Sequence, residues 1–184
     1  MNYENRISEL LKEYMTERGF KLWTGINGAL PNIWNKPTSS TGKYHQKEGG
    51  RVPDVAEHTF EMLFAASKLL KMFDINKNTS EADTIMFAIA LHDSLKYGED
   101  GDMEHTDNKH DHLAGNMIES NKSVFRKILN ESQYSSLHSA VKYHSGRWST
   151  DASPEFNFNS MDKEVLFVHM LDMMSTADLI KLKE

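Results

Sequence analysis

Apolar residues recur every three or four positions along most of the chain, and this spacing is the period of an amphipathic helix. The first such face consists of Ile7, Leu10, Leu11 and Tyr14. Gly19 is a typical helix stop, so we predict one N-terminal helix over residues 1–20. Residues 22–51 are rich in Gly, Asn, Ser, Thr and Pro and keep no sustained period. They predict a long surface loop, and a loop of that length in a compact domain is often functional.

Helical spacing returns from Pro53, where Asp54 stands in the first turn, and continues to Phe73. Ser80 is a good N-cap for a helix that runs to His92. Further helices are predicted over residues 113–119, 124–129, 132–143 and 162–183. The chain has no internal repeat and no alternating strand pattern of useful length. We therefore expect an all-α protein, a compact helical bundle with long loops whose core spans residues 52–184.

The composition is that of an ordinary globular protein, because 39% of its 184 residues are hydrophobic and 26% are charged. This length supports one domain with a substantial core. The formal net charge of -6 disfavours a nucleic-acid partner held through its phosphates. Cysteine is absent, which excludes disulfides, thiolate metal sites and thiol nucleophiles. The nine histidines must therefore supply any nitrogen ligand for a metal.

No stretch of the sequence approaches the roughly 18 consecutive apolar residues of a membrane-spanning helix. The N-terminus, from Met1 to Arg6, lacks the basic start and apolar centre of a signal peptide. We therefore expect a cytoplasmic protein without a membrane partner, and the sequence leaves a homodimer open.

The pair His92-Asp93 ends an apolar helical run, where two adjacent ionisable groups need a compensating partner. Further imidazoles and carboxylates stand in separate segments, at His58, His112, His144 and Asp172. Separate segments can surround a divalent ion, whereas one short segment cannot. The run His110-Asp111-His112 offers two imidazoles, so His110 is an alternative ligand to His112. We interpret His45, His105 and His138 as structural histidines.

An ordered set of residues resembles the HD superfamily of metal-dependent phosphohydrolases, whose pattern is a lone His, a His-Asp doublet and a distal Asp. The matching pieces are His58-Thr59, Leu91-His92-Asp93 with Lys96 beyond it, and Asp172. Similar further pieces are Gly49-Gly50, His112-Leu113-Ala114-Gly115 and Tyr143-His144-Ser145-Gly146. The resemblance covers residues 43–178 and implies a single HD domain over residues 1–184.

Three departures from the family pattern limit what the resemblance implies. Ser145 stands where dinuclear members often have a second His, and Ser175 stands where some relatives carry another Asp. The Gly-Tyr-Pro signature of cyclic-di-GMP phosphodiesterases does not follow His144. We therefore do not expect cyclic-di-GMP to be the substrate.

The resemblance implies a ligand set, and the chemistry and position of nearby residues predict further roles. A divalent metal would be bound by His58, His92, Asp93 and Asp172, and His112 and His144 would serve a second ion. The ligand set suits Mn, Fe, Co, Ni or Zn better than Mg, which stays a candidate. Asp93 and Lys96 would be catalytic, with attack by a metal-bound hydroxide. The candidate substrate contacts are Lys96, Arg51 and Arg147, and the candidate general acids are Glu57, Glu61 and Asp111. His169, one turn before Asp172, is a candidate outer partner.

Three functions agree with these residues. The first is hydrolysis of the phosphate ester of a small molecule, most simply a nucleotide, and the ligand set and Lys96 favour it. The second is a phosphodiesterase acting on a cyclic nucleotide or an RNA end. The third is a nucleotide sensor that binds metal without turnover. Substrate turnover by an Asp93 variant would separate the enzymes from the sensor.

Overall fold

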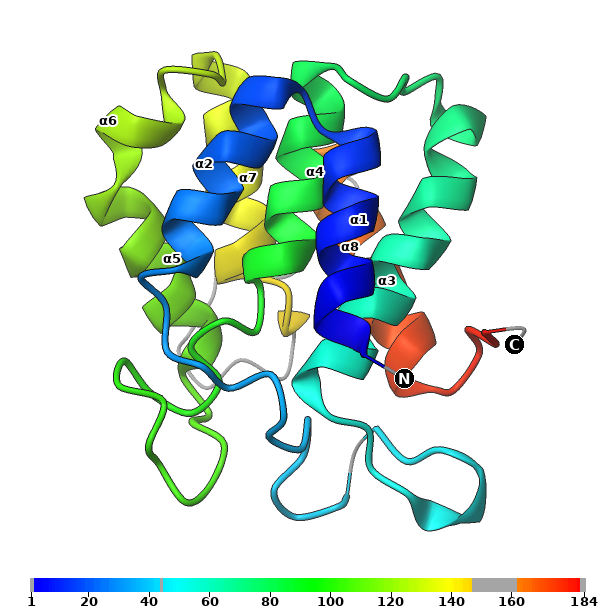
Figure 1. The fold of residues 1–184 in the computed structure, drawn as a ribbon. Coiled ribbons are helices and arrows are strands. Elements are labelled where there is room, and N and C mark those ends of the chain that lie inside the picture. The colour runs from blue at the N-terminus through cyan, green and yellow to red at the C-terminus, as the bar shows by residue number, and fades with distance from the viewer. Residues whose placement is uncertain (1, 44, 147–161, 183–184) are drawn as a thin grey trace.

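The computed structural model describes residues 2–43, 45–146 and 162–182, and helices form all of its longer elements (Figure 1). They are α1 (Tyr3–Tyr14), α2 (Glu17–Asn27), α3 (Val55–Leu69), α4 (Ser80–Leu91), α5 (His110–Ser120), α6 (Lys122–Phe125), α7 (Glu131–Lys142) and α8 (Lys163–Thr176). Two short 3-10 segments lie at Glu48–Gly50 and Leu70–Phe73. In the described ranges extended pairing is limited to one bridge between Pro37 and Asp54, so the predicted all-α class is confirmed.

Helix α4 is the centre of the bundle and packs against α1, α2, α3, α7 and α8 (Figure 1). Apolar side chains surround it on all sides, and a helix of that kind must be buried. Ten of its residues, Ala82 to Leu91, are buried. One hydrophobic cluster extends from Ile7 in α1 to Leu171 in α8. Over the described residues, no helix is both long and apolar enough to cross a membrane.

Side-chain caps fix where the central helices begin. The carboxylate of Asp54 accepts a hydrogen bond from the Glu57 backbone N–H at 2.7 Å, so α3 starts at Val55. The cap of α4 is Thr79, whose hydroxyl accepts from the Ala82 N–H, and not the predicted Ser80. The difference is one residue and leaves the course of α4 as predicted.

The N-terminal region differs from the prediction of one helix followed by a loop from residue 22. The backbone turns out of α1 at Met15, and Thr16 caps a second helix, α2, that runs to Asn27. Gly19 is therefore inside a helix and does not end one. A Cβ at this position would lie 2.4 Å from Asp83 Oδ1, so glycine lets α2 approach the buried carboxylate that binds Thr16.

Three further boundaries differ from the prediction. Helix α6 spans Lys122–Phe125 and not residues 124–129. Helix α5 begins at His110 and not near residue 113. Just before it, the carboxylate of Asp107 accepts a hydrogen bond from the Lys109 N–H. Helix α8 ends at Thr176 and not near residue 183, because the backbone turns left-handed at Asp178, where φ is 56°. The predicted loop over residues 147–160 lies outside the described residues.

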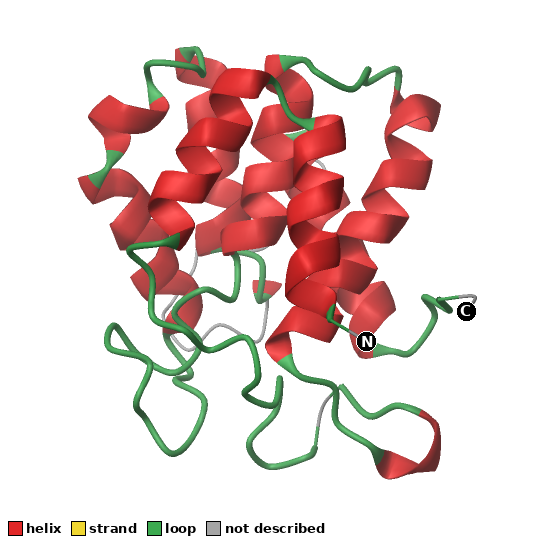
Figure 2. Ribbon diagram, viewed as in Figure 1, coloured by secondary structure: helices red, strands yellow, loops and turns green. Residues whose placement is uncertain are grey.

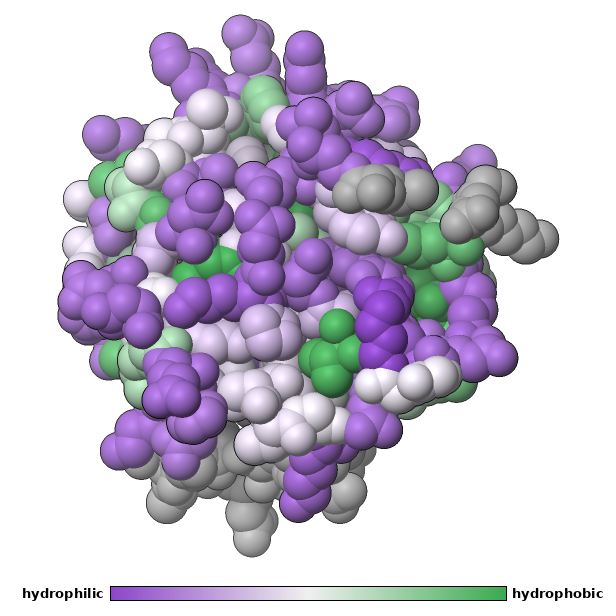
Figure 3. Space-filling model, turned by 60° about the horizontal axis from the view of Figure 1, so that its bottom comes forward, coloured by the Kyte–Doolittle hydropathy of each residue, from purple (hydrophilic) through white to green (hydrophobic). Residues whose placement is uncertain are grey.

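Long loops gather at one end of the bundle, whereas short turns join the helices at the other end (Figure 2). The two long described loops, residues 28–54 and 92–109, connect α2 to α3 and α4 to α5. The face at this end is mainly hydrophilic (Figure 3). The amino ends of α3 and α5 and the carboxyl ends of α4 and α7 therefore meet beneath polar loops.

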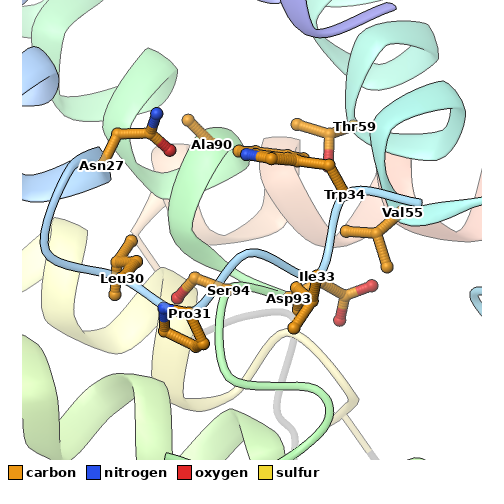
Figure 4. Close-up of a pocket in the computed structure, with 10 residues that line it drawn as sticks. All are labelled: Asn27, Leu30, Pro31, Ile33, Trp34, Val55, Thr59, Ala90, Asp93 and Ser94. Carbon is orange, nitrogen blue, oxygen red and sulfur yellow. The ribbon is translucent and has the colours of Figure 1, made fainter. Parts of the chain in front are cut away.

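The first part of the loop after α2 packs against the end of α4. Pro31, Ile33 and Trp34 lie beside Ala90 and Ser94 and leave a cavity of only about 10 Å³ (Figure 4). A cavity of this size holds one water molecule at most. This side of Asp93 is consequently closed to any larger ligand.

Candidate metal centre

Five segments bring their imidazoles and carboxylates together around Asp93. The residue follows His92 at the carboxyl end of α4, is 2% exposed and directs its two oxygens to different neighbours. We call the atoms around Oδ2 the inner group, which comprises His58, His92, Asp93 and Asp172. We call the atoms around Oδ1 the outer group, which comprises Asp93, His110 and His144.

The two imidazoles of the inner group are fully buried. The Nε2 atoms of His58 and His92 lie 3.2 Å apart. Asp172 Oδ1 lies 3.2 Å from His58 Nε2, and Asp93 Oδ2 lies 3.5 Å from His92 Nε2. His58 and His92 are 0% exposed, so these atoms lie where α3, α4 and α8 pack together.

The outer group repeats this arrangement on the other oxygen. Asp93 Oδ1 lies 3.1 Å from His110 Nε2 and 3.5 Å from His144 Nε2. The two Nε2 atoms are themselves 3.2 Å apart. One carboxylate thus offers one oxygen to each pair of imidazoles, as a ligand shared by two cations would do.

Backbone carbonyls set the proton position on three of the four imidazoles. In each case Nδ1 lies 2.7 Å from the carbonyl oxygen three residues earlier: His92 faces Ile89, His110 faces Asp107, and His144 faces Val141. A carbonyl can only accept, so the proton is on Nδ1 and the Nδ1–H donates. The Nε2 atoms that face Asp93 therefore keep their lone pairs for a metal.

The donor set fits a divalent cation. Lone pairs and carboxylate oxygens crowd together without protons of their own, which is unfavourable unless a positive charge lies between them. Asp93 Oδ1 is buried and has no well-formed hydrogen bond, although two imidazoles surround it. Imidazole and carboxylate ligands suit Mn, Fe, Co, Ni or Zn. The inner group could hold one such ion and the outer group another.

Burial and charge keep this centre negative. Burial alone would raise the pKa of Asp172, but His58 outweighs it and holds the pKa well below its usual value. Burial opposes ionisation of Asp93 in the same way, and the ammonium of Lys96 holds its pKa low. Burial lowers the pKa of His92 to about 3, so this imidazole is neutral. Burial also disfavours the charged form of His144, yet the neighbouring Asp93 raises its pKa. The centre thus attracts positive charge.

A pocket of about 390 Å³ opens onto the centre from the side of the polar loops. Asp93, Asp172, His110 and His144 line it, but His58 and His92 do not. Its wall carries hydroxyl groups from the loop after α2, from the loop before α5 and from α8, namely Thr38, Ser39, Thr41, Thr106 and Thr176. The volume lies in the range of small-molecule sites.

The predicted substrate contacts are placed differently from one another. Lys96 lines the pocket, and its Nζ lies 2.5 Å from Asp93 Oδ2. Arg51 does not reach this pocket, because both of its terminal nitrogens bind the carboxylate of Glu57, at 2.5 and 2.7 Å. It lines a separate pocket near the N-terminus of the chain. Arg147 lies outside the described residues.

The histidines near α5 and α7 also differ from the sequence interpretation. The alternative ligand His110 belongs to the outer group, whereas His112 packs its ring against Tyr143, with 6.4 Å between the ring centroids. His169 does not face Asp172, because its Nδ1 donates to the carbonyl oxygen of His144 at 2.7 Å. It therefore holds the backbone of a candidate ligand.

His45, which the sequence analysis interprets as a structural histidine, lies at the pocket. Its ring lies 4.7 Å from that of His58, it lines the pocket, and its backbone has a φ of 59°. Burial lowers the pKa of His45 to about 2, so it faces the pocket as a neutral imidazole. Its position after Gly42 and Lys43 in the loop carried no helical or motif signal.

The three candidate general acids do not line the pocket. Glu57 is held by Arg51, and Glu61 binds Lys47 at 2.6 Å. Asp111 is buried, with Oδ1 accepting from the His112 N–H and Oδ2 lacking a hydrogen-bond partner among the described residues. Glu57 and Glu61 are thus engaged in ion pairs, and Asp111 in a local hydrogen bond.

Comparison with known proteins places the chain in a family. The model of the HD domain matches residues 55–180, which contain every ligand of the inner and outer groups. The protein therefore belongs to the HD-domain family, a superfamily of metal-dependent phosphohydrolases. No curated protein and no solved structure matches the chain.

Proposed function

We propose that this protein hydrolyses the phosphate ester of a nucleotide-sized small molecule, with one divalent cation at the inner group and a second at the outer group. The observation that carries the proposal is the position of Asp93, which offers one oxygen to each group at the base of the pocket. Bound there, divalent cations lower the pKa of a coordinated water and polarise a phosphoryl oxygen.

The residues of the chain have separate tasks in this proposal. Asp93 contributes an oxygen to both the inner and the outer group. Asp172 completes the inner group on the side that faces the pocket. Lys96 has three N–H donors, of which Asp93 takes one, and the others can bind a phosphate oxygen as its charge grows. Hydroxyl groups of the pocket wall can bind the remaining phosphate oxygens or a sugar.

The pocket supports a small substrate. Its volume of about 390 Å³ exceeds that of a phosphate ion and is near the lower end of sites that enclose a drug-sized molecule. The net charge of -6 also disfavours long nucleic acids. A nucleotide is therefore favoured over a polymer as the substrate.

The test is chromatography of the products released from a panel of substrates in the presence of Mn²⁺. The panel contains nucleoside mono-, di- and triphosphates, cyclic mononucleotides and a short RNA. Asp93→Ala is compared with the wild-type protein and with Asp100→Ala, which removes an exposed carboxylate in the turn after α4. We expect turnover of a nucleotide by the wild type and by Asp100→Ala, and none by Asp93→Ala.

The products identify the function. Free phosphate and nucleoside from a monophosphate support the proposed activity. Hydrolysis confined to cyclic nucleotides or RNA would replace it with a phosphodiesterase. Metal binding without turnover of any substrate would contradict the proposal and favour a sensor.

A further inference from the structure

His58 is oriented differently from the other three imidazoles of the metal centre. His92, His110 and His144 each donate Nδ1–H to a backbone carbonyl. The Nδ1 of His58 instead lies 2.8 Å from the side-chain oxygen of Ser175 in α8. A substitution cannot remove a carbonyl, but it can remove this hydroxyl, so the orientation of His58 depends on one side chain.

The direction of the hydrogen bonds follows from the chemistry of the groups. Ser175 Oγ lies 2.7 Å from Glu61 Oε2, and a carboxylate can only accept. A hydroxyl has one hydrogen, and Ser175 donates it to Glu61. Its oxygen must therefore accept from His58, which places the proton of His58 on Nδ1 and leaves Nε2 unprotonated.

A buried cation completes this chain of contacts. Lys47 Nζ lies 2.6 Å from Glu61 Oε2 and 3.3 Å from Asp178 Oδ1. The side chains of Lys47 and Glu61 are only 8% and 4% exposed. The chain of contacts therefore joins the loop before α3, helix α3, helix α8 and the segment after α8. We call Ser175, Glu61 and Lys47 the relay.

We propose that the relay sets the metal affinity of the inner group by orienting His58 and strengthening it as a ligand. The proposal rests on the metal centre of the proposed function. A carboxylate behind the hydroxyl draws the hydroxyl hydrogen toward itself and leaves the oxygen a stronger acceptor for the imidazole N–H. An imidazole that donates to such an acceptor is fixed in one tautomer and is more basic at its other nitrogen. Among the described residues, the imidazole Nδ1 atoms of the outer group donate to backbone carbonyls and not to a side chain.

Ser175 and Glu61 are positioning residues in this scheme, since neither lines the pocket. The serine and Glu61 together supply an acceptor for His58 that is backed by negative charge.

The experiment is calorimetric titration of Mn²⁺ into the metal-free full-length protein, which measures each binding step without substrate. The variants are Ser175→Ala and Ser175→Thr, the second of which keeps a hydroxyl. The matched control is Ser136→Ala, because Ser136 is also a buried helical serine and binds a carboxylate, that of Asp162, at 2.9 Å. Thermal unfolding without metal checks that each variant is folded.

We expect Ser175→Ala to weaken one Mn²⁺ step by about 10- to 100-fold and to leave the other unchanged. Ser175→Thr should restore most of the affinity, and Ser136→Ala should match the wild type. Imidazole ¹⁵N shifts of the metal-free protein should report the Nδ1–H tautomer of His58 in the wild type and its loss in Ser175→Ala. If Ser175→Ala does not fold, Glu61→Gln replaces it and should weaken the same step.

Equal affinities in the wild type and Ser175→Ala would overturn the relay and leave the proposed function intact. An equal weakening of both steps would also overturn it, because the effect would then not belong to His58. If the wild-type protein bound no Mn²⁺, the metal centre of the proposed function would fail and the relay with it.

Discussion

His58 and His92 lie on one side of Asp93, and His110 and His144 lie on the other. The first pair is 0% exposed and does not line the pocket. The second pair lines the pocket, and the side chain of His110 is 14% exposed. Two groups built from the same residue types around one carboxylate thus differ in their access to a ligand.

This difference follows from the position of each residue in its helix. His58 lies one turn inside α3 and His92 ends α4, two helices of the buried core. His110 is the first residue of α5, and His144 lies just after α7, beside the long loops. The inner imidazoles thus lie in the packed core, whereas the outer imidazoles line the pocket. We therefore expect the inner group to serve metal affinity most and the outer group to serve substrate contact most.

The largest effect is expected when the shared ligand is lost. Asp93→Asn replaces one of the two carboxylate oxygens with an amide nitrogen and removes the negative charge that both groups share. Both binding steps and turnover should therefore fall by more than about 100-fold. It also leaves Lys96 buried without its partner, which should cost about 3–5 kcal/mol of unfolding free energy. Metal content after dialysis and chemical denaturation measure the two effects.

The double variant Asp93→Asn/Lys96→Met separates these effects. It removes the unpaired ammonium, so stability should recover while metal binding stays lost. Retention of either Mn²⁺ step by Asp93→Asn would refute a carboxylate shared by the two groups.

Variants that lack one imidazole test the inner and outer groups separately. His92→Ala should abolish the inner binding step, and His144→Ala should abolish the outer step, with one ion retained in each case. The physical reason is that each removes an Nε2 ligand from one group only. The stoichiometry of Mn²⁺ binding is the measurement. Loss of both ions in both variants would mean that the groups form one indivisible site.

Helix α5 offers a sharper test of the outer group. His110→Ala should remove the outer ion, whereas His112→Ala should leave metal stoichiometry unchanged because its ring faces Tyr143. The two variants delete the same side chain two residues apart, so each controls for the other. The opposite result would assign the outer ligand to His112.

The smallest effect is expected on the melting temperature. A ligand at 100 times its Kd stabilises the folded state by about 2.7 kcal/mol, which corresponds to roughly 5–11 °C for a chain of this size. Mn²⁺ should raise the melting temperature of the wild type and of His144→Ala, with a smaller rise in the variant, and EDTA should reverse both. No rise in either protein would contradict metal binding to the folded state.

Local signals made most of the bundle predictable. Asp54 ahead of an apolar run and Asn130 with Gln133 at the start of α7 are capping patterns that need no tertiary contact. Helix α2 was missed because its glycines and polar residues resemble a loop. It is stabilised by contacts distant in sequence, through Gly19 against Asp83 and through the burial of Trp23 beside Trp34.

The sequence by itself determined the family and predicted four residues that the structure brings together, because His58, His92, Asp93 and Asp172 stand in an ordered motif on helices that periodicity reveals. The choice between His110 and His112 needed the tertiary structure. Residues two apart are rotated by about 200° around the helix axis, so they lie on nearly opposite faces of the helix. Which of them faces Asp93 depends on the side of α5 that packs on α7.

The tertiary structure also decided which polar side chains reach the metal centre. Arg51 is bound by Glu57, and His45 and Ser175 reach His58 from segments far away in the chain. Hydrogen bonds between such segments depend on how the helices pack, and a linear motif does not encode that packing. The sequence therefore determined which chemistry this protein carries, and the packing of α3, α4, α5, α7 and α8 decided how its ligands are oriented.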